Sequence, residues 1–372
     1  FPRRPRPKGD VPRERYLDQP RIRPTRAPAW RREPSVADPN NAFLGFWKGR
    51  RVLVTGHAGF VGANLMAELL DRGALPMGYD HVLYSASLKA LGADCPRVAG
   101  DVMDLSLLMR TMHDFRPEVI YHLAGQGHIK DSQEAPFAAF HLNAMGTVAV
   151  LEAVRREAPH AVVVCASSNH AYIGGCDFAP YVTARIFEKA PLAATDVYGS
   201  SKIMADVAVR CYRESYDLRA AAVRHVNAYG PADPHASHLV TGAILSCLEG
   251  KRPVLRSDGS AVKGYLHVAD VVSAYLAVAE RIDDLLEHAV NVAVPACEAS
   301  ALEVAREVMR AAGMDGEPEV LGEDLSQSGY MERLDDGLIQ SLGWVPRFGL
   351  RTGIAAAYEW YKAHGAMAWL AD

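Results

Sequence analysis

The chain has 372 residues, of which 49% are hydrophobic and 23% are charged, and its formal net charge at pH 7 is −4. This is the composition of a globular protein with a large core, and the charge gives no reason to expect nucleic acid or an anionic membrane as a partner. No apolar run reaches the roughly 18 residues of a membrane-spanning helix.

The start of the sequence lacks the apolar core of a secretory signal, and the six cysteines form no C-x-x-C pair. We therefore expect a reduced, cytoplasmic protein without a bound metal. Residues 1–41 differ from the rest because they are dense in Arg and Pro and have little apolar periodicity. They are typical of a solvated, extended tail, and their charge also allows docking on an acidic partner or a neighbouring subunit.

From residue 50 onwards, buried strands alternate with amphipathic helices. The predicted strands are 51–56, 75–80, 97–102, 118–125, 160–168 and 219–230, and the predicted helices are 61–73, 141–158 and 198–216. This alternation indicates an α/β fold with a doubly wound parallel sheet. After about residue 231 the elements become short and irregular. We therefore expect one domain over residues 42–230 and a smaller C-terminal lobe over 231–372, some segments of which return to the sheet.

A glycine motif follows the first strand, with Gly56, Gly59 and Gly62 at intervals of three. Between a strand and a helix, this spacing gives a tight turn, a close approach of the backbone to a pyrophosphate, and close helix packing. The helix N-terminus then faces the anion. Ala58, Phe60 and Val61 belong to the same predicted cofactor-binding turn.

The ends of the next strands provide the other predicted cofactor contacts. Asp80 ends the second strand, and a carboxylate there binds ribose hydroxyls and repels a 2′-phosphate, which favours NAD over NADP. Asp101 and Val102 follow the third strand, where we expect them to meet the adenine, although Asp101 is equally suited to a turn. Small or apolar residues that let the cofactor come close end the fourth strand: Leu123, Ala124 and Gly125.

Tyr198 and Lys202 are four residues apart and therefore share one face of a helix. An ammonium group lowers the pKa of a nearby phenol, so that Tyr198 can take a proton from a sugar hydroxyl as hydride leaves for the nicotinamide. The lysine can also hold the nicotinamide ribose. The motif gains specificity from the glycine turn and from Ser168 at the end of the fifth strand.

These motifs together resemble the extended short-chain dehydrogenase/reductase superfamily, and within it the nucleotide-sugar epimerases and dehydratases. The likeness extends from residue 46 to about residue 364 and includes VTGHAGFVG, YHLAGQ, YGSSKIMAD, RHVNAYGP and SDGSAVKGYLHVAD. The opening FWKGRRVLVTGHAGFVG is particularly similar to CDP-glucose 4,6-dehydratases. The resemblance implies a Rossmann-type fold, NAD, a nucleotide-diphosphate sugar as substrate, and a homodimer built on the two long helices.

By the same resemblance, Ser168 bonds the reacting hydroxyl, Tyr198 is the base and Lys202 is its partner. Asn143 is expected near the active-site backbone, and Asn227 is expected on the substrate diphosphate. The family usually has Arg where this chain has Lys263, and a lysine cannot form the bidentate fork of an arginine. Arg256 is an alternative cation for the diphosphate.

Asn169 and His170 follow Ser168, where dehydratases of the family carry an acid-base pair. An amide cannot supply a proton at neutral pH, whereas His170 can serve as one acid or base. We therefore expect an epimerase acting through a transient keto-sugar, by hydride return at C4 or by proton exchange at His170. The alternatives are a 4,6-dehydratase, a uronate-type dehydrogenase (SSNH resembles such enzymes) and a scaffold that binds nucleotide without catalysis.

The loop after the fourth strand carries further candidates for substrate contact. They are His128, Lys130 and Ser132. Ordinary solvation of a loop explains these polar residues equally well.

Overall fold

The computed structural model describes residues 44–172, 185–324, 328 and 330–365. The Arg- and Pro-rich extension predicted over residues 1–41 lies outside the described residues. The short helix α1 (Leu44–Trp47) precedes the first strand.

A seven-stranded sheet forms the centre of the larger part, in the order β10-β6-β5-β4-β1-β2-β3. Its strands are β1 (Arg51–Thr55), β2 (Leu75–Asp80), β3 (Arg97–Ala99), β4 (Val119–His122), β5 (Val162–Ala166), β6 (Ala220–His225) and β10 (Ala289–Val292). All neighbouring strands are parallel, and Val54 pairs with Gly78 on one side and with Tyr121 on the other. The prediction of a Rossmann-type, doubly wound parallel sheet is therefore confirmed.

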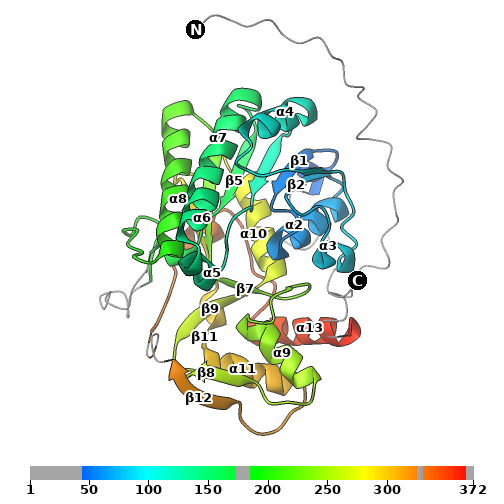
Figure 1. The fold of residues 1–372 in the computed structure, drawn as a ribbon, viewed down its shortest axis with the longest axis vertical. Coiled ribbons are helices and arrows are strands. Elements are labelled where there is room, and N and C mark those ends of the chain that lie inside the picture. The colour runs from blue at the N-terminus through cyan, green and yellow to red at the C-terminus, as the bar shows by residue number, and fades with distance from the viewer. Residues whose placement is uncertain (1–43, 173–184, 325–327, 329, 366–372) are drawn as a thin grey trace, which may run out of the picture.

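Helices cover both faces of this sheet (Figure 1). One face packs on α2 (Phe60–Asp71) and α10 (Val268–Glu280), and the other packs on α4 (Leu105–Phe115), α7 (Gly146–Glu157) and α8 (Val197–Tyr216). Alternate strand residues enter two separate hydrophobic clusters, Val52 and Val54 on the first face and Leu53 on the second. Successive side chains of a strand point to opposite faces of the sheet. Because both faces of this sheet are covered by helices, the strands are largely apolar on both faces.

The predicted helix 141–158 has a more complex start. A short helix α5 (Ile129–Glu134) leads to α6 (Pro136–Phe140), and one π-helical turn, η3 (His141–Met145), joins α6 to α7. The continuous run Pro136–Glu157 is long and apolar enough to span a membrane by composition, contrary to our expectation from the sequence. It packs against α4 and α8 in this structure, which accounts for its apolar character.

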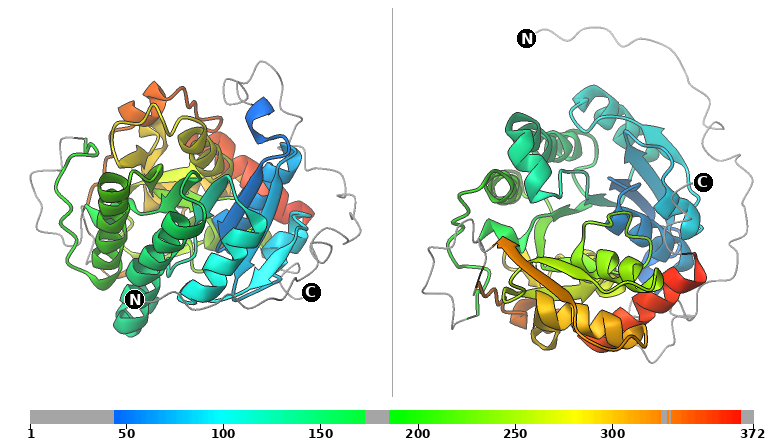
Figure 2. Two further views of the ribbon diagram at one scale, coloured as in Figure 1. Left: turned by 90° about the horizontal axis from the view of Figure 1, so that it is seen from above. Right: turned by 60° about the horizontal axis from the view of Figure 1, so that its bottom comes forward.

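The smaller lobe faces the carboxyl ends of the central strands (Figures 1 and 2). It contains β7 (Asn227–Tyr229), β9 (Val262–His267) and β11 (Glu298–Ser300) in one sheet, β8 (Val254–Ser257) and β12 (Glu319–Asp324) in another, and the helices α9 (Leu239–Leu248), α11 (Ala301–Ala311) and α13 (Leu350–Ala363). The predicted strand 219–230 is thus two strands, because the chain leaves the central sheet at Val226 and β7 pairs with β9.

Candidate active site

A cavity of about 1030 Å³ lies between the carboxyl edge of the central sheet and the smaller lobe. The glycine turn, the ends of β4 and β5, the start of α8, and β7, β8 and β9 all contribute to its wall. In an open α/β sheet, this edge is where ligands bind. The cavity therefore joins the predicted cofactor turn to the predicted substrate residues in one space.

The glycine turn fits a dinucleotide. Gly56 has φ +73°, and a Cβ atom there would lie 2.5 Å from the backbone nitrogen of Ala124. A Cβ atom on Gly62 would lie 2.1 Å from the carbonyl oxygen of Gly56. Helix α2 begins at Phe60 with Gly59 as its N-cap, and a glycine has no side chain to cap the first turn. The helix N-terminus is therefore presented to the cavity, which Gly59, Phe60, Val61 and Gly62 line.

Asp80 lies next to this turn, as the sequence predicts. Its Oδ2 accepts a hydrogen bond from the backbone N–H of Ala58 at 3.2 Å, and its Oδ1 accepts one from Val82 at 3.1 Å. The carboxylate is nearly buried and so is fixed beside the glycine turn. It retains acceptor capacity for ribose hydroxyls because each carboxylate oxygen accepts more than one bond.

Asp101 and Val102 do not line the cavity. The Oδ1 atom of Asp101 accepts a hydrogen bond from the backbone N–H of Met103 at 2.9 Å, which is the geometry of a turn. Val102 is buried, and its side chain lies beneath Gly146 at the start of α7. The structure therefore shows turn and packing contacts for these two residues, and their contact with the adenine stays a prediction.

The end of β4 approaches the cofactor turn closely. Leu123 and Gly125 line the cavity, whereas Ala124 lies with its backbone against Gly56. Asn143, in the π-helical turn, accepts a hydrogen bond from the N–H of Gln126 at 2.8 Å and donates one to the Gln126 carbonyl at 3.1 Å. Asn143 thus holds the active-site backbone without lining the cavity itself.

Ser168, Tyr198 and Lys202 meet in the cavity. The pKa of Tyr198 is raised, because burial outweighs the lowering effect of its hydrogen bond with Ser168. Lys202 Nζ lies 6.0 Å from the centre of the Tyr198 ring and donates to the carbonyl of Ala166 at 3.2 Å. Burial lowers the pKa of Lys202 to about 8. Burial dominates the pKa of both groups, so the pKa of Tyr198 is raised and not lowered as the spacing to Lys202 predicts.

A buried ion pair joins β6 to α8, and a serine at the end of β5 bonds to the same carboxylate. Arg224 donates two hydrogen bonds to Asp206, at 2.8 and 2.6 Å, and the Oγ of Ser167 donates to the same carboxylate at 3.0 Å. Ser167 precedes Ser168, and Asp206 lies one turn beyond Lys202 on α8. The Ser167 bond therefore holds the segment that contains Ser168 against the helix that carries Tyr198 and Lys202.

Asn169 and His170 each contact a carboxylate that the sequence analysis missed. The Nδ2 of Asn169 donates a hydrogen bond to the Oε1 of Glu332, which comes from the smaller lobe. The Nε2 of His170 lies 3.1 Å from the Oδ2 of Asp196. The pKa of Asp196 is lowered although burial alone would raise it, because His170 and the N–H of Gly199 stabilise the carboxylate.

Of the three loop residues predicted to contact substrate, one lines the cavity and two do not. His128 lines the cavity. Lys130 is exposed and pairs with Glu134 at 3.8 Å, while Ser132 is fully buried and donates from Oγ to the carbonyl of His128 at 2.8 Å. Lys130 and Ser132 therefore do not contact the cavity as expected, because α5 turns their side chains to solvent and to its own backbone.

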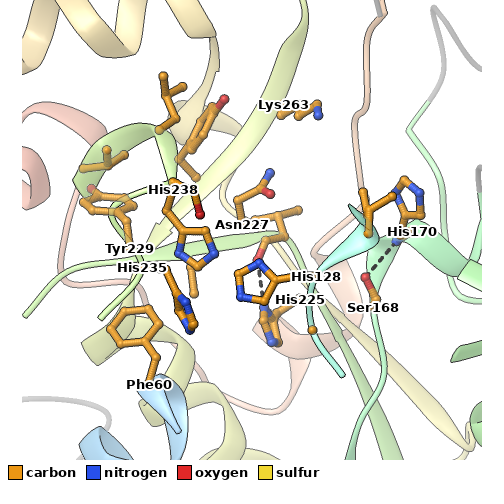
Figure 3. A pocket seen from close by; sticks show the side chains of 18 of the residues that line it. Phe60, His128, Ser168, His170, His225, Asn227, Tyr229, His235, His238 and Lys263 are labelled. Atoms are coloured by element: carbon orange, nitrogen blue, oxygen red, sulfur yellow. Dashed lines mark hydrogen bonds between the residues drawn. The ribbon is translucent and has the colours of Figure 1, made fainter. Parts of the chain in front are cut away.

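The lobe presents Asn227, Arg256 and Lys263 to the cavity. Asn227 donates to the carbonyl of Gly264 at 3.1 Å, and burial lowers the pKa of Lys263 while Glu332 partly restores it. Figure 3 shows Asn227 in the centre of the view and Lys263 above it, with Ser168 and His170 to their right. These residues line the cavity together, and their contact with a substrate diphosphate stays a prediction.

Three histidines that the sequence left without a common role gather near Asn227, in the left and central part of the view (Figure 3). The ring of His128 lies 4.4 Å from that of His235 and 5.0 Å from that of His238. Buried Asp233 holds His238, since the Nδ1 of His238 lies 2.7 Å from the Oδ2 of Asp233. Within the described residues, no group of three or more His, Cys, Asp or Glu side chains has the geometry to hold a metal.

The whole arrangement is suited to hydride transfer from a sugar hydroxyl. A bound NAD would supply the hydride acceptor. Ser168 and Tyr198 are placed to hold and deprotonate the hydroxyl, and the positive charge of an oxidised nicotinamide would lower the phenol pKa, since an opposite charge favours the ionised form. Lys202, buried next to Tyr198, is placed to hold the nicotinamide ribose.

Comparisons with known proteins agree with this chemistry. The NAD dependent epimerase/dehydratase family matches residues 52–293. The chain is 28% identical over 336 residues to CDP-glucose 4,6-dehydratase of Salmonella typhimurium, covering 86% of this chain and 92% of that protein. It is 32% identical over 324 residues to UDP-glucose 4-epimerase of Mycolicibacterium smegmatis, covering 84% and 98%.

Solved structures give the same result. UDP-glucose 4-epimerase of Thermus thermophilus, in complex with NAD, matches with a TM-score of 0.72 and 29% identity over 84% of this chain and 99% of that chain. dTDP-glucose 4,6-dehydratase of Bacillus anthracis, in complex with NAD, matches with a TM-score of 0.74 and 25% identity over 87% and 99%. The predicted family, the enzyme class and NAD as cofactor are confirmed. The chain belongs to the NAD dependent epimerase/dehydratase family.

Proposed function

We propose that this chain is an NAD-dependent nucleotide-sugar epimerase that acts through a transient keto-sugar. The observation that carries the proposal is the position of Ser168, Tyr198 and Lys202 in one cavity with the glycine turn and with Asn227 and Lys263. Tyr198 takes the sugar hydroxyl proton as hydride leaves, and hydride returns to the other face of the ketone. Asn227 and Lys263, or Arg256, bind the diphosphate of the nucleotide sugar.

A 4,6-dehydratase is the second candidate, and the carboxylate of Glu332 against Asn169 favours it. A dehydratase needs an acid and a base beside the ketone, and Asn169 cannot supply the acid. Glu332 and His170 together provide two groups capable of proton transfer at that end of the cavity.

One experiment separates these outcomes. The full chain is incubated with UDP-, dTDP-, CDP- and GDP-glucose in heavy water, and the products are analysed by mass spectrometry and NMR. Inversion at C4 without deuterium uptake supports the epimerase. Loss of one water supports the dehydratase, and accumulation of free NADH supports a dehydrogenase. A protein that forms no NADH and changes no sugar would contradict all three.

We further propose a cytoplasmic homodimer. Large apolar side chains are exposed on α6, η3 and α8, which pack together: Phe137, Met145, Met204 and Val207. A second copy of the chain would cover them by pairing its own α7 and α8. The extension over residues 1–41 is proposed to dock on the neighbouring subunit of that dimer.

A further inference from the structure

The buried carboxylate of Glu332 lies next to Asn169, the position at which dehydratases of the family carry an acid. Glu332 is only 4% exposed, yet it lines the active-site cavity. A buried charge is costly unless polar or charged groups surround it, so a carboxylate kept at a cavity wall indicates a use for it. Its Oε1 accepts a hydrogen bond from the Asn169 amide, and its Oε2 is 3.4 Å from the Tyr330 hydroxyl.

The contact connects Glu332 to Ser168, the residue expected to bond the reacting sugar hydroxyl. Ser168 Oγ donates to Asn169 Oδ1 at 3.1 Å, and Asn169 Nδ2 donates to Glu332. The chain of bonds therefore runs from Ser168 through the Asn169 amide to a carboxylate. Lys263, whose pKa Glu332 raises against the effect of burial, supplies a positive charge on the lobe side.

His170 provides a second group on the same short segment. Its ring lines the cavity, and its centre is 5.7 Å from the centre of the Tyr198 ring. Its Nε2 faces Asp196, which holds the imidazole in one orientation. Among the residues that the structure describes, the ring contacts a polar side chain through Nε2, which leaves Nδ1 to face a sugar.

We propose that Glu332 and His170 are the two proton-transfer groups for a step at the carbon next to the sugar ketone, with Glu332 replacing the acid that is absent at Asn169. The inference rests on the oxidation to a keto-sugar in the proposed function, because the ketone must first form, and it adds a proton transfer to the simple return of hydride at C4. One group accepts the proton of the adjacent C–H bond, and the C–H electron pair moves into the carbonyl to give an enolate.

The other group, in its protonated form, then completes the step. It donates its proton either to the opposite face of the same carbon, which inverts that centre, or to the hydroxyl on the next carbon. In the second case the C–O electron pair leaves with the oxygen as water and a C=C bond forms. Protons and electrons balance in both cases without any oxidant beyond the NAD of the first step.

The test uses the full chain in its NAD-bound form with the substrate identified from the four nucleotide sugars named above. NADH formation on the enzyme is followed at 340 nm in a single turnover, and deuterium uptake from heavy water is followed by NMR. For Glu332→Gln we expect NADH formation within about threefold of the wild type and deuterium uptake or water loss reduced at least about 100-fold. Tyr330→Phe, which removes the other hydrogen bond to Glu332, is the matched control and should change neither readout by more than about threefold.

A rescue variant separates proton transfer from a structural role. Asn169→Asp combined with Glu332→Gln restores a carboxylate at the strand end and should recover at least about tenfold of the lost deuterium uptake. Normal uptake in Glu332→Gln, or loss of NADH formation together with uptake, would overturn the proposal. Wild-type enzyme that forms NADH and inverts C4 without uptake would also overturn it while leaving the proposed function intact. Absence of NADH in the wild type would instead remove the proposed function itself.

Discussion

His170 Nε2 lies 3.1 Å from Asp196 Oδ2, and the other carboxylate oxygen of Asp196 accepts a hydrogen bond from the N–H of Gly199 at 3.0 Å. Asp196 is the N-cap of α8, the helix that carries Tyr198. A single side chain therefore both begins the catalytic helix and orients the imidazole at the end of β5. Because different carboxylate oxygens make the two contacts, a substitution can keep the cap of α8 and change the contact with His170.

Asp196→Asn should keep the helix cap and disturb the imidazole. An asparagine oxygen still accepts from Gly199, but its amide donates to His170 Nε2 and so moves the ring proton to Nδ1. We expect NADH formation to persist and deuterium uptake to fall at least about tenfold. Asp196→Ala, the companion variant, should show the same loss and also lose about 1 kcal/mol of unfolding free energy by urea denaturation. Wild-type uptake in Asp196→Asn would contradict this role.

Tyr198→Phe should abolish turnover while cofactor binding remains. The phenol hydroxyl is the group placed to take the sugar proton, and its removal costs about 100-fold or more. NAD affinity, measured by isothermal titration calorimetry, should change by less than about threefold, because the glycine turn is untouched. Tyr216→Phe, on the exposed end of the same helix, is the control and should retain full turnover. A Tyr198→Phe enzyme with normal turnover would refute the hydride mechanism.

Gly62→Ala should weaken NAD binding. The new Cβ would lie 2.1 Å from the Gly56 carbonyl oxygen, so the turn and α2 must move apart. We expect NAD affinity to fall at least about tenfold and stability to fall by about 1–3 kcal/mol. Gly45→Ala, in helix α1 where a Cβ meets nothing within 4 Å, should leave NAD affinity unchanged and should not lower stability. Titration calorimetry and thermal unfolding measure the two effects.

Glu280 should make stability fall as pH rises from about 4.5 to about 7. Burial raises the pKa of this carboxyl to about 7, against the lowering effects of Trp47 and Arg72. Between the ordinary and the raised pKa, the folded state binds more protons than the unfolded state, so the unfolding free energy falls with rising pH, by on the order of 3 kcal/mol in total. Urea denaturation at pH 5, 6, 7 and 8 should show a shallower slope in Glu280→Gln. An unchanged slope would contradict the assignment.

Met204→Glu should convert a dimer into a monomer. Met204 lies on α8 within the exposed apolar set that also contains Phe137 and Met145. A charge buried at a symmetric interface is repeated in both copies and is therefore strongly unfavourable. Light scattering after gel filtration measures the mass, and Leu286→Glu, at a 90% exposed site outside this set, should leave it unchanged. A wild-type mass equal to one chain would contradict the dimer.

The local sequence by itself predicted the parallel sheet, the cofactor turn and the Tyr–Lys pair. Gly56, Gly62, Tyr198 and Lys202 could be identified because each belongs to a short motif whose spacing carries its physical reason, a turn or a helical face. Asp80 followed from the strand that it ends. The alternation of strands and helices likewise predicted the parallel sheet, since a strand period of two and a helix period of 3.6 are local properties.

Only the tertiary structure decided which distant side chains complete the site and which predicted ones do not reach it. Glu332 is 163 residues from Asn169, and no spacing rule connects them, because their contact depends on how the smaller lobe packs on the central sheet. Lys130 turned out to face solvent because the side chains of a short helix point in all directions around its axis. The elevated pKa of Tyr198 likewise came from burial, a property of the packed protein that the four-residue spacing to Lys202 does not contain.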